Sequence, residues 1–295
     1  MLPTFVVIGA PKAGTTALYW YLAEHPQVHM SALKETNFFA YGVDDAGRLR
    51  YGDPQLHRFP VRSLDAYERL FADADGATAV GEISPIYLEC PQAAGRMAGL
   101  LPDAQIVCVL RNPVDRAYSD YQMYLRTRGR RLDPERDLTV DAPWAQADSH
   151  WVRVGRYHQH LTRYYAAYRP EQIHVQLFDE LRSDTTAAVQ AIYRALGVDD
   201  TFVPDLDTPH NVGGVPANMA FERVLTSKRI KRMVEPWIPR RLGNLARRVR
   251  TANLQRPPAL PDPLRAQLTD HFRADIAGTE ALIGRDLQHW LSSDS

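Results

Sequence analysis

The strongest constraint on the fold lies at the start of the chain, where a short apolar run leads through a glycine-bearing loop into a helix-forming segment. Residues 5–10 are apolar, which indicates a buried strand of a parallel sheet. Residues 15–24 carry apolar side chains at helical spacing and stop at His25-Pro26. A strand that passes through a tight loop into a helix predicts an α/β fold, because this unit builds parallel sheets.

The same unit recurs along the first two thirds of the chain. The apolar stretch Gln105–Leu110 precedes a helix expected from about 114 to 126, and Ile173–Phe178 precedes a helix expected over Thr185–Leu196. Thr78–Ile83 is a fourth candidate strand. Strands that alternate with helices predict a central parallel sheet flanked by helices on both faces, with a nucleotide-kinase-like topology.

The character of the chain changes after about residue 205. The segment Ser227–Arg250 holds nine basic residues against one acid, and apolar residues recur between its charges. Asp262, followed by Pro263, is expected to cap the start of a final helix. We therefore predict a single domain over residues 1–295, with a core at about 4–205 and a C-terminal helical cap at about 206–295.

Composition excludes several classes of protein. Lysine plus arginine equals aspartate plus glutamate at 35 each, so no overall positive field favours nucleic acid. The two cysteines, Cys90 and Cys108, cannot form a disulfide framework. The first residues show no secretion signal, and no apolar run approaches the roughly 20 residues that a membrane span needs. A cytoplasmic protein without a transmembrane segment is expected.

The loop after the first strand has the features of an anion site. Backbone N–H groups in the turn Gly9–Thr16, together with the positive end of the following helix dipole, form a cradle for phosphate. Lys12 adds a charge, and Thr15 and Thr16 add hydroxyl donors. The Walker A motif requires its lysine directly after the second glycine. Here Lys12 precedes Gly14 by two residues, which disfavours the alternative of an ATP- and magnesium-dependent kinase.

A second anion site is expected after the strand that ends at Leu110. Arg111 follows this strand directly, and Ser119 lies about two turns along the next helix. A guanidinium group suits bidentate recognition of phosphate. The alternative is that Arg111 forms an ion pair with Asp115, and the residues alone leave both interpretations open.

Taken together, Pro11–Thr16 and Leu110–Ser119 resemble the nucleotide signature of sulfotransferases that use 3′-phosphoadenosine 5′-phosphosulfate (PAPS). The similarity is strongest to the heparan sulfate and bacterial carbohydrate type. Further matches are Lys34–Phe39, Gly81–Tyr87, Gly155–Tyr157 and Ile283–Trp290. The resemblance extends over about residues 4–290. It departs at Ile83, where the animal heparan sulfate enzymes commonly carry a lysine.

The resemblance implies roles for individual residues. It implies PAPS as donor, adenosine 3′,5′-bisphosphate (PAP) as product, and no metal ion. Lys12 would stabilise the leaving phosphate, and Glu35 would be the general base, with His29 as second candidate. In the family a basic segment near the C-terminus closes over the nucleotide. Its nearest equivalent here is Arg256, and Asn211–Gly214 is the alternative. The residues expected to bind the nucleotide are Lys12, Ala13, Gly14, Thr15, Thr16, Arg111, Ser119, Tyr157 and Arg256.

The acceptor is expected to be a hydroxyl or amine of a carbohydrate, glycolipid or natural product. Trp144 and Trp151 lie in an irregular segment where it could bind, whereas Tyr118, Tyr121 and Tyr124 recur at helical spacing and are expected in the core. The basic stretch 228–250 could be a lid, a contact with a membrane surface or a solvated cap. A nucleotide-binding protein that has lost its catalysis is the remaining alternative.

Overall fold

A computed structural model describes residues 1–42, 58–206, 215–216, 254–255 and 257–292. Five strands form one parallel sheet in the order β2-β3-β1-β4-β5. The order confirms the α/β fold with a central parallel sheet that the sequence predicts. The strands are β1 (Phe5–Gly9), β2 (Val28–Met30), β3 (Ala79–Ile83), β4 (Gln105–Leu110) and β5 (Ile173–Leu177).

The central strands β1 and β3 are buried along their whole length, as apolar runs in a parallel sheet favour, and Glu82 is the one charged residue in β3. The ring of Phe5 on β1 fills the space beside Gly81 on β3, where a Cβ atom would lie 2.3 Å from Cζ. The short edge strand β2 was not expected from the sequence. Phe178 was expected to end the last strand, but it is the first residue of a helix.

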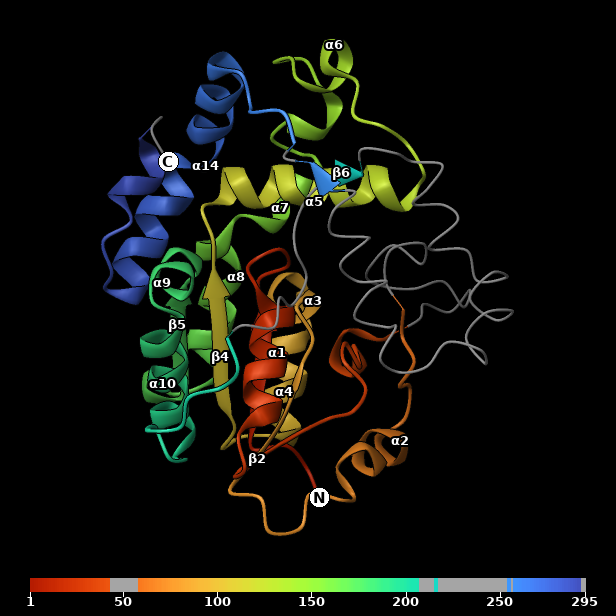
Figure 1. The fold of residues 1–295 in the computed structure, drawn as a ribbon, viewed down its shortest axis with the longest axis vertical. Coiled ribbons are helices and arrows are strands. Elements are labelled where there is room, and N and C mark those ends of the chain that lie inside the picture. Colours follow the sequence, from red (N-terminus) through yellow and green to blue (C-terminus); the bar gives the residue numbers. More distant parts are fainter. Residues whose placement is uncertain (43–57, 207–214, 217–253, 256, 293–295) are drawn as a thin grey trace.

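Helices cover both faces of the sheet (Figure 1). The hydroxyl of Tyr193 on α10 donates to the carbonyl of Tyr21 on α1 at 2.8 Å, which joins these two helices. On the other face α4 packs against α8, and α14 packs on α8 in turn. The helices are α1 (Thr15–Glu24), α2 (Leu64–Glu68), α3 (Ile86–Glu89), α4 (Ala93–Leu100), α5 (Pro113–Thr127), α6 (Pro134–Asp137), α7 (His150–Val154), α8 (Tyr157–Ala167), α9 (Phe178–Ser183), α10 (Thr185–Leu196) and α14 (Asp262–Ile283).

Helix α5 begins almost directly after β4 and crosses the carboxyl end of the sheet (Figure 1). Asn112 is its N-cap, and its side chain accepts a hydrogen bond from the backbone N–H of Val114 at 3.0 Å. Pro113 occupies the first turn, where its missing N–H costs nothing. The cap therefore turns the chain sharply and places α5 beside the loop that follows β1.

The final helix α14 corrects one detail of the sequence interpretation. Pro261 occupies the N-cap position, and Asp262 is already in the first turn. The carboxylate there still complements the positive end of the helix dipole. Leu264, Leu268 and Phe272 are buried as expected, and they belong to the same hydrophobic core as the sheet.

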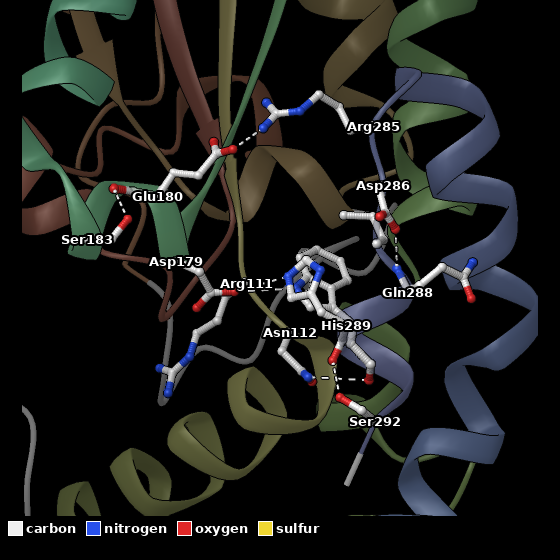
Figure 2. A network of polar contacts seen from close by, with 12 residues as sticks. Arg111, Asn112, Asp179, Glu180, Ser183, Arg285, Asp286, Gln288, His289 and Ser292 are labelled. Carbon is white, nitrogen blue, oxygen red and sulfur yellow. Dashed lines mark hydrogen bonds and ion pairs between the residues drawn. The ribbon is translucent and has the colours of Figure 1, made fainter. Parts of the chain in front are cut away.

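A short 3₁₀ helix, η6 (Gln288–Leu291), closes the C-terminal segment against the end of β4 (Figure 2). The indole of buried Trp290 donates to the Asp179 carboxylate at 3.4 Å, and the amide of Asn112 donates to the Trp290 carbonyl at 3.4 Å. His289 lies 3.6 Å from the same carboxylate. These contacts place the terminal motif next to Arg111.

Several parts of the sequence interpretation concern residues outside the described ranges. They are the basic stretch 228–250, the segment 211–214 and Arg256. Two short strands, β6 (Val215–Pro216) and β7 (Leu254–Gln255), pair in antiparallel fashion. Among the helices that the structure describes, none combines the length and apolarity required to traverse a bilayer. Further 3₁₀ turns are η1 (Phe38–Ala40), η2 (Arg69–Phe71), η3 (Pro143–Ala145) and η4 (Pro170–Gln172).

Candidate active site

The loop between β1 and α1 has the geometry of an anion cradle. Lys12 and Gly14 have φ values of 70° and 84°, which curl the backbone around the start of α1. The first-turn N–H groups of α1 have no intrahelical partner, and Gly14 provides no side chain that could cap them. A Cβ at Gly14 would lie 3.1 Å from the Phe178 ring. Ala13 is fully buried under the loop.

Lys12 is a cation held largely away from water. Burial lowers its pKa to about 8, with Arg126, Arg111 and Arg116 acting in the same direction and Asp120 opposing them. Its Nζ donates to the Met123 sulfur at 3.4 Å, which is a weak acceptor. Among the residues that the structure describes, Lys12 makes no ion pair. An anion that entered here would therefore form a strong electrostatic interaction with the Lys12 ammonium.

Arg111 lies at the carboxyl end of β4, next to this loop. Its Nη1 donates to the Lys12 carbonyl at 3.1 Å, and its guanidinium lies 5.0 Å from the centre of the Phe178 ring. Asp115, the alternative partner weighed from the sequence, instead pairs with Arg265 of α14 at 2.9 Å. Ser119 is partly exposed further along α5. Arg111 of the second predicted anion site thus contacts the loop of the first.

Tyr157 lies behind Arg111. It is fully buried at the start of α8, and its hydroxyl donates to the Arg111 carbonyl at 2.8 Å. Burial raises its pKa, so this hydroxyl keeps its proton. This hydrogen bond holds the backbone of Arg111 in place at the end of β4.

A pocket of about 350 Å³ opens beside the loop. Lys12, Thr15 and Thr16 of the loop line it together with Glu35. Arg111 and Ser119 do not contribute to its lining. The pocket therefore brings together the two residues for which the sequence predicts catalytic roles, one a cation and the other a carboxylate.

Glu35 projects from the segment that follows β2. Its backbone has a φ of 61°, and its N–H donates to the Ile83 carbonyl at 2.9 Å. Its carboxylate also accepts a hydrogen bond from the neighbouring Lys34 at 2.8 Å. Exposed ion pairs contribute little free energy, so this contact leaves the carboxylate accessible. Its side chain is 53% exposed.

The pocket is also lined by residues that the sequence interpretation only partly found. Trp151 and Tyr124 meet edge to face with ring centres 5.2 Å apart. His150 and buried Glu89 lie beside them, with Nδ1 and Oε2 4.0 Å apart. Neither of the latter two was singled out from the sequence. They follow no motif, and only the packing of α7 near α3 brings them together.

Other residues weighed from the sequence lie elsewhere. His29 is on the edge strand β2 and does not line the pocket. His25 ends α1 as expected, and its ring contacts the Asp199 carbonyl at 2.9 Å. Tyr121 is buried and stacks on Trp144 with ring centres 4.9 Å apart, so both belong to the core.

A parallel sheet with a phosphate-type loop after its first strand and an arginine after a neighbouring strand defines a P-loop-like α/β protein. Comparison with known families then gives the particular class: the chain belongs to the sulfotransferase family, whose model matches residues 3–202. Within the described residues, no three histidine, cysteine, aspartate or glutamate side chains gather as metal ligands would.

Individual relatives agree with this assignment. The human bifunctional heparan sulfate N-deacetylase/N-sulfotransferase 2 is 31% identical over 209 residues, which cover 67% of this chain and 22% of that protein. The membrane-associated sulfotransferase kil1 of Dictyostelium discoideum is 29% identical over 144 residues, covering 48% of this chain and 27% of kil1. The chain thus matches about a quarter or less of the length of these relatives.

Among solved structures, the sulfotransferase from Alicyclobacillus acidocaldarius is similar over the whole chain. It superimposes with a TM-score of 0.71 at 30% identity, covering 99% of this chain and 100% of that one. The agreement in fold extends beyond the region matched by the family model, into the C-terminal helix.

Proposed function

We propose that the protein transfers a sulfuryl group from PAPS to a hydroxyl or amine of an acceptor. The observation that carries the proposal is the shared pocket of Lys12 and Glu35, next to the contact between Lys12 and Arg111. A desolvated cation and a carboxylate that line one cavity can serve the leaving group and the acceptor in a displacement at sulfur. The membership of the chain in the sulfotransferase family supports this reading.

The proposed chemistry uses the two catalytic residues at opposite ends. The Glu35 carboxylate takes the proton of the acceptor hydroxyl as the acceptor oxygen bonds to sulfur. The bond between sulfur and the bridging oxygen breaks, and its electron pair stays on the phosphate that leaves. Lys12 and the first-turn N–H groups of α1 stabilise the charge that develops there.

The nucleotide would be held at both of its phosphates. Gly14, Thr15 and Thr16 face the 5′ end, while Arg111 and Ser119 take the 3′-phosphate. Tyr157 would position Arg111 through its carbonyl. Ala13 would contribute backbone only, since its side chain is buried. A role for Arg256 over the nucleotide remains a prediction from the resemblance.

The acceptor would be a carbohydrate, a glycolipid or a hydroxylated natural product. The edge-to-face pair of Trp151 and Tyr124 offers aromatic surface on which the apolar face of a sugar can pack. The human relative acts on heparan sulfate by name, which supports a carbohydrate acceptor. A location in the cytoplasm, a single domain over 1–295 and a contact of 228–250 with the acceptor or a membrane remain predictions.

The proposal is tested by incubating the protein with PAPS and a panel of sugars, glycolipids and amino sugars. Mass spectrometry should find an acceptor heavier by one SO₃ group, and Lys12→Ala should abolish the gain. Transfer from ATP in the presence of magnesium would instead support a kinase. Tight binding of PAP without turnover on any acceptor would support a nucleotide-binding protein without catalysis, and failure to bind PAP would overturn the proposal.

A further inference from the structure

A fully buried carboxylate lies behind the segment that carries Glu35. Glu82 of β3 accepts four hydroxyl hydrogen bonds, from Tyr67 at 2.8 Å and Tyr87 at 2.9 Å on Oε1, and from Thr36 and Ser84 at 2.7 Å each on Oε2. We call these five residues the Glu82 cluster. The hydroxyls come from three segments of the chain, at Thr36, at Tyr67 and over residues 84–87, so this carboxylate joins parts of the chain that are distant in sequence.

The proposed reaction makes no use of Glu82, yet a buried carboxylate is costly to retain. No cation among the described residues pairs with it. Burial raises its pKa, and the hydrogen bonds from the four hydroxyls oppose that rise. A carboxylate has about four acceptor sites, and here all of them are filled. The arrangement is therefore saturated, which points to a role in holding its surroundings in one geometry.

The segment in front of the cluster has an unfavourable backbone. Glu35 has a φ of 61°, in the left-handed region that residues other than glycine, asparagine and aspartate seldom adopt, and Asn37, which tolerates this region, has a φ of 53°. Thr36 stands between them and turns its side chain inward to Glu82. Such a conformation persists only where the surroundings enforce it. We call residues 35–39 the Glu35 strap.

The cluster supplies this enforcement through its hydroxyls. A hydroxyl has one proton, and where that proton is donated to Glu82 the oxygen lone pairs remain free to accept. Ser84 Oγ accepts from the N–H of Asn37 at 3.1 Å, and the Tyr87 hydroxyl accepts from the N–H of Phe39 at 3.4 Å. Because each of these hydroxyls points its proton at Glu82, its oxygen lone pairs are directed toward the backbone N–H groups of the strap.

We propose that Glu82 is a positioning residue, which orients the cluster hydroxyls so that the strap holds the Glu35 carboxylate in the pocket that it shares with Lys12. This inference rests on the proposed role of Glu35 as general base. It predicts that a change inside the cluster lowers turnover through Glu35 and leaves the nucleotide site intact.

Thr36 offers the least disruptive test. Thr36→Val keeps the shape of the side chain and removes its hydroxyl, whereas Thr36→Ser keeps the hydroxyl. We expect Thr36→Val to lower kcat about 10- to 100-fold, the scale of a small misplacement of a catalytic group, with the Kd for PAP unchanged. Thr36→Ser should restore most of the loss. Equal kcat for Thr36→Val and the native protein would overturn the inference.

Glu82→Gln tests the carboxylate itself. The NH₂ group of the glutamine side chain would donate to two of the hydroxyls that now donate to Glu82. The lone pairs of these hydroxyl oxygens would then no longer be directed toward the backbone N–H groups of the strap. The expected loss of kcat equals or exceeds that of Thr36→Val. As a matched control, Tyr168→Phe removes another buried tyrosine hydroxyl, which bonds to the Leu101 carbonyl at 3.2 Å, and should leave kcat unchanged.

A double-mutant cycle distinguishes positioning from general loss of stability. In a Glu35→Gln background, Thr36→Val should lower kcat no further, because the group that it misplaces is already absent. Losses that multiply would overturn the inference. A Glu82→Gln protein that does not fold leaves the Thr36 pair and the cycle intact as tests.

Hydrogen exchange provides a measurement that needs no activity. Thr36→Val should speed exchange at the amides of residues 37–39 and leave the amides of the loop 10–16 unchanged, with PAP present in both samples. Unchanged exchange in the strap would overturn the inference. If the native protein transfers no sulfuryl group, the proposed function fails, and this comparison still reports whether the cluster holds the strap.

Discussion

The guanidinium of Arg111 donates a hydrogen bond to the backbone carbonyl of Lys12 at 3.1 Å, although 99 positions separate the two residues. Their strands β1 and β4 are parallel neighbours, with Val7 opposite Val107. Loops that leave adjacent parallel strands at their carboxyl ends emerge about 5 Å apart. The topology therefore brings the loop after β1 into contact with Arg111 after β4, and the proposed function requires one nucleotide to bind across both.

Arg111 should discriminate between nucleotides that have and lack a 3′-phosphate. We expect Arg111→Ala to weaken PAP binding about 10- to 100-fold, since a hydrogen bond to a charged group contributes about 1.5–3 kcal/mol. Binding of adenosine 5′-monophosphate should change little. Isothermal titration calorimetry with both nucleotides measures this. Arg111→Lys keeps the charge but loses the planar fork, so it should recover only part of the affinity.

A uniform loss for both nucleotides would contradict this assignment. It would indicate that Arg111 acts through the Lys12 loop, which it also contacts, and not through a 3′-phosphate.

Lys12 should give the reaction an alkaline limb. Its pKa in the free protein is lowered to about 8, so the ammonium that stabilises the leaving phosphate is lost as the pH rises above that value. We expect kcat/KM for PAPS to fall tenfold per pH unit above about pH 8. Lys12→Arg keeps its charge throughout this range, so its residual activity should lack the limb.

The free energy of unfolding should rise over the same alkaline range in which kcat/KM falls. Between about 8 and the ordinary value of 10.5, folded Lys12 has lost a proton that the unfolded chain retains. Its contribution to the free energy of unfolding therefore rises with pH over this window. Urea titrations of the native protein and Lys12→Met should diverge from pH 8 to 10. A parallel course would show that Lys12 is not desolvated.

The sequence was sufficient for most of the sheet because a parallel strand buried on both faces has a continuous apolar pattern. β2 escaped prediction because its three residues alternate too briefly to show a period. The start of α14 was misplaced by one residue, since aspartate favours both the N-cap and the first turn. Such errors are local and leave the topology unchanged.

In the site, the sequence could predict only what a contiguous motif carries. Lys12 and Glu35 were found through local motifs, and the structure places both in one pocket. The partner of Asp115 could not be found, because Arg265 lies 150 positions away. Glu82 entered the sequence analysis only within the family-like segment Gly81–Tyr87. Its burial and its four hydroxyl partners depend on packing between segments that no local pattern reveals.

The close approach of Phe5 to Gly81 predicts a sharp difference between two glycines. A Cβ at Gly81 would lie 2.3 Å from the Phe5 ring, so we expect Gly81→Ala to destabilise the protein by at least about 1–3 kcal/mol. Gly95 is in α4 with nothing within 4 Å, and Gly95→Ala should stabilise by about 0.5–1 kcal/mol. Urea unfolding measures both. Destabilisation of similar size at both positions would contradict the packing of β1 against β3.

Trp151 should contribute to binding of the acceptor and not to binding of PAPS. Trp151 lines the same pocket as Lys12, and its ring contacts that of Tyr124. With an acceptor identified, we expect Trp151→Ala to raise the acceptor KM about tenfold, because stacking of an aromatic ring contributes about 0.5–1.5 kcal/mol beyond its buried area. The KM for PAPS should be unchanged, and Trp151→Phe should retain most of the affinity. Trp20, exposed on α1 and absent from the pocket, is the matched control, since Trp20→Ala should alter neither constant. An equal rise in both constants for Trp151→Ala would show that the ring supports the pocket as a whole and does not bind the acceptor.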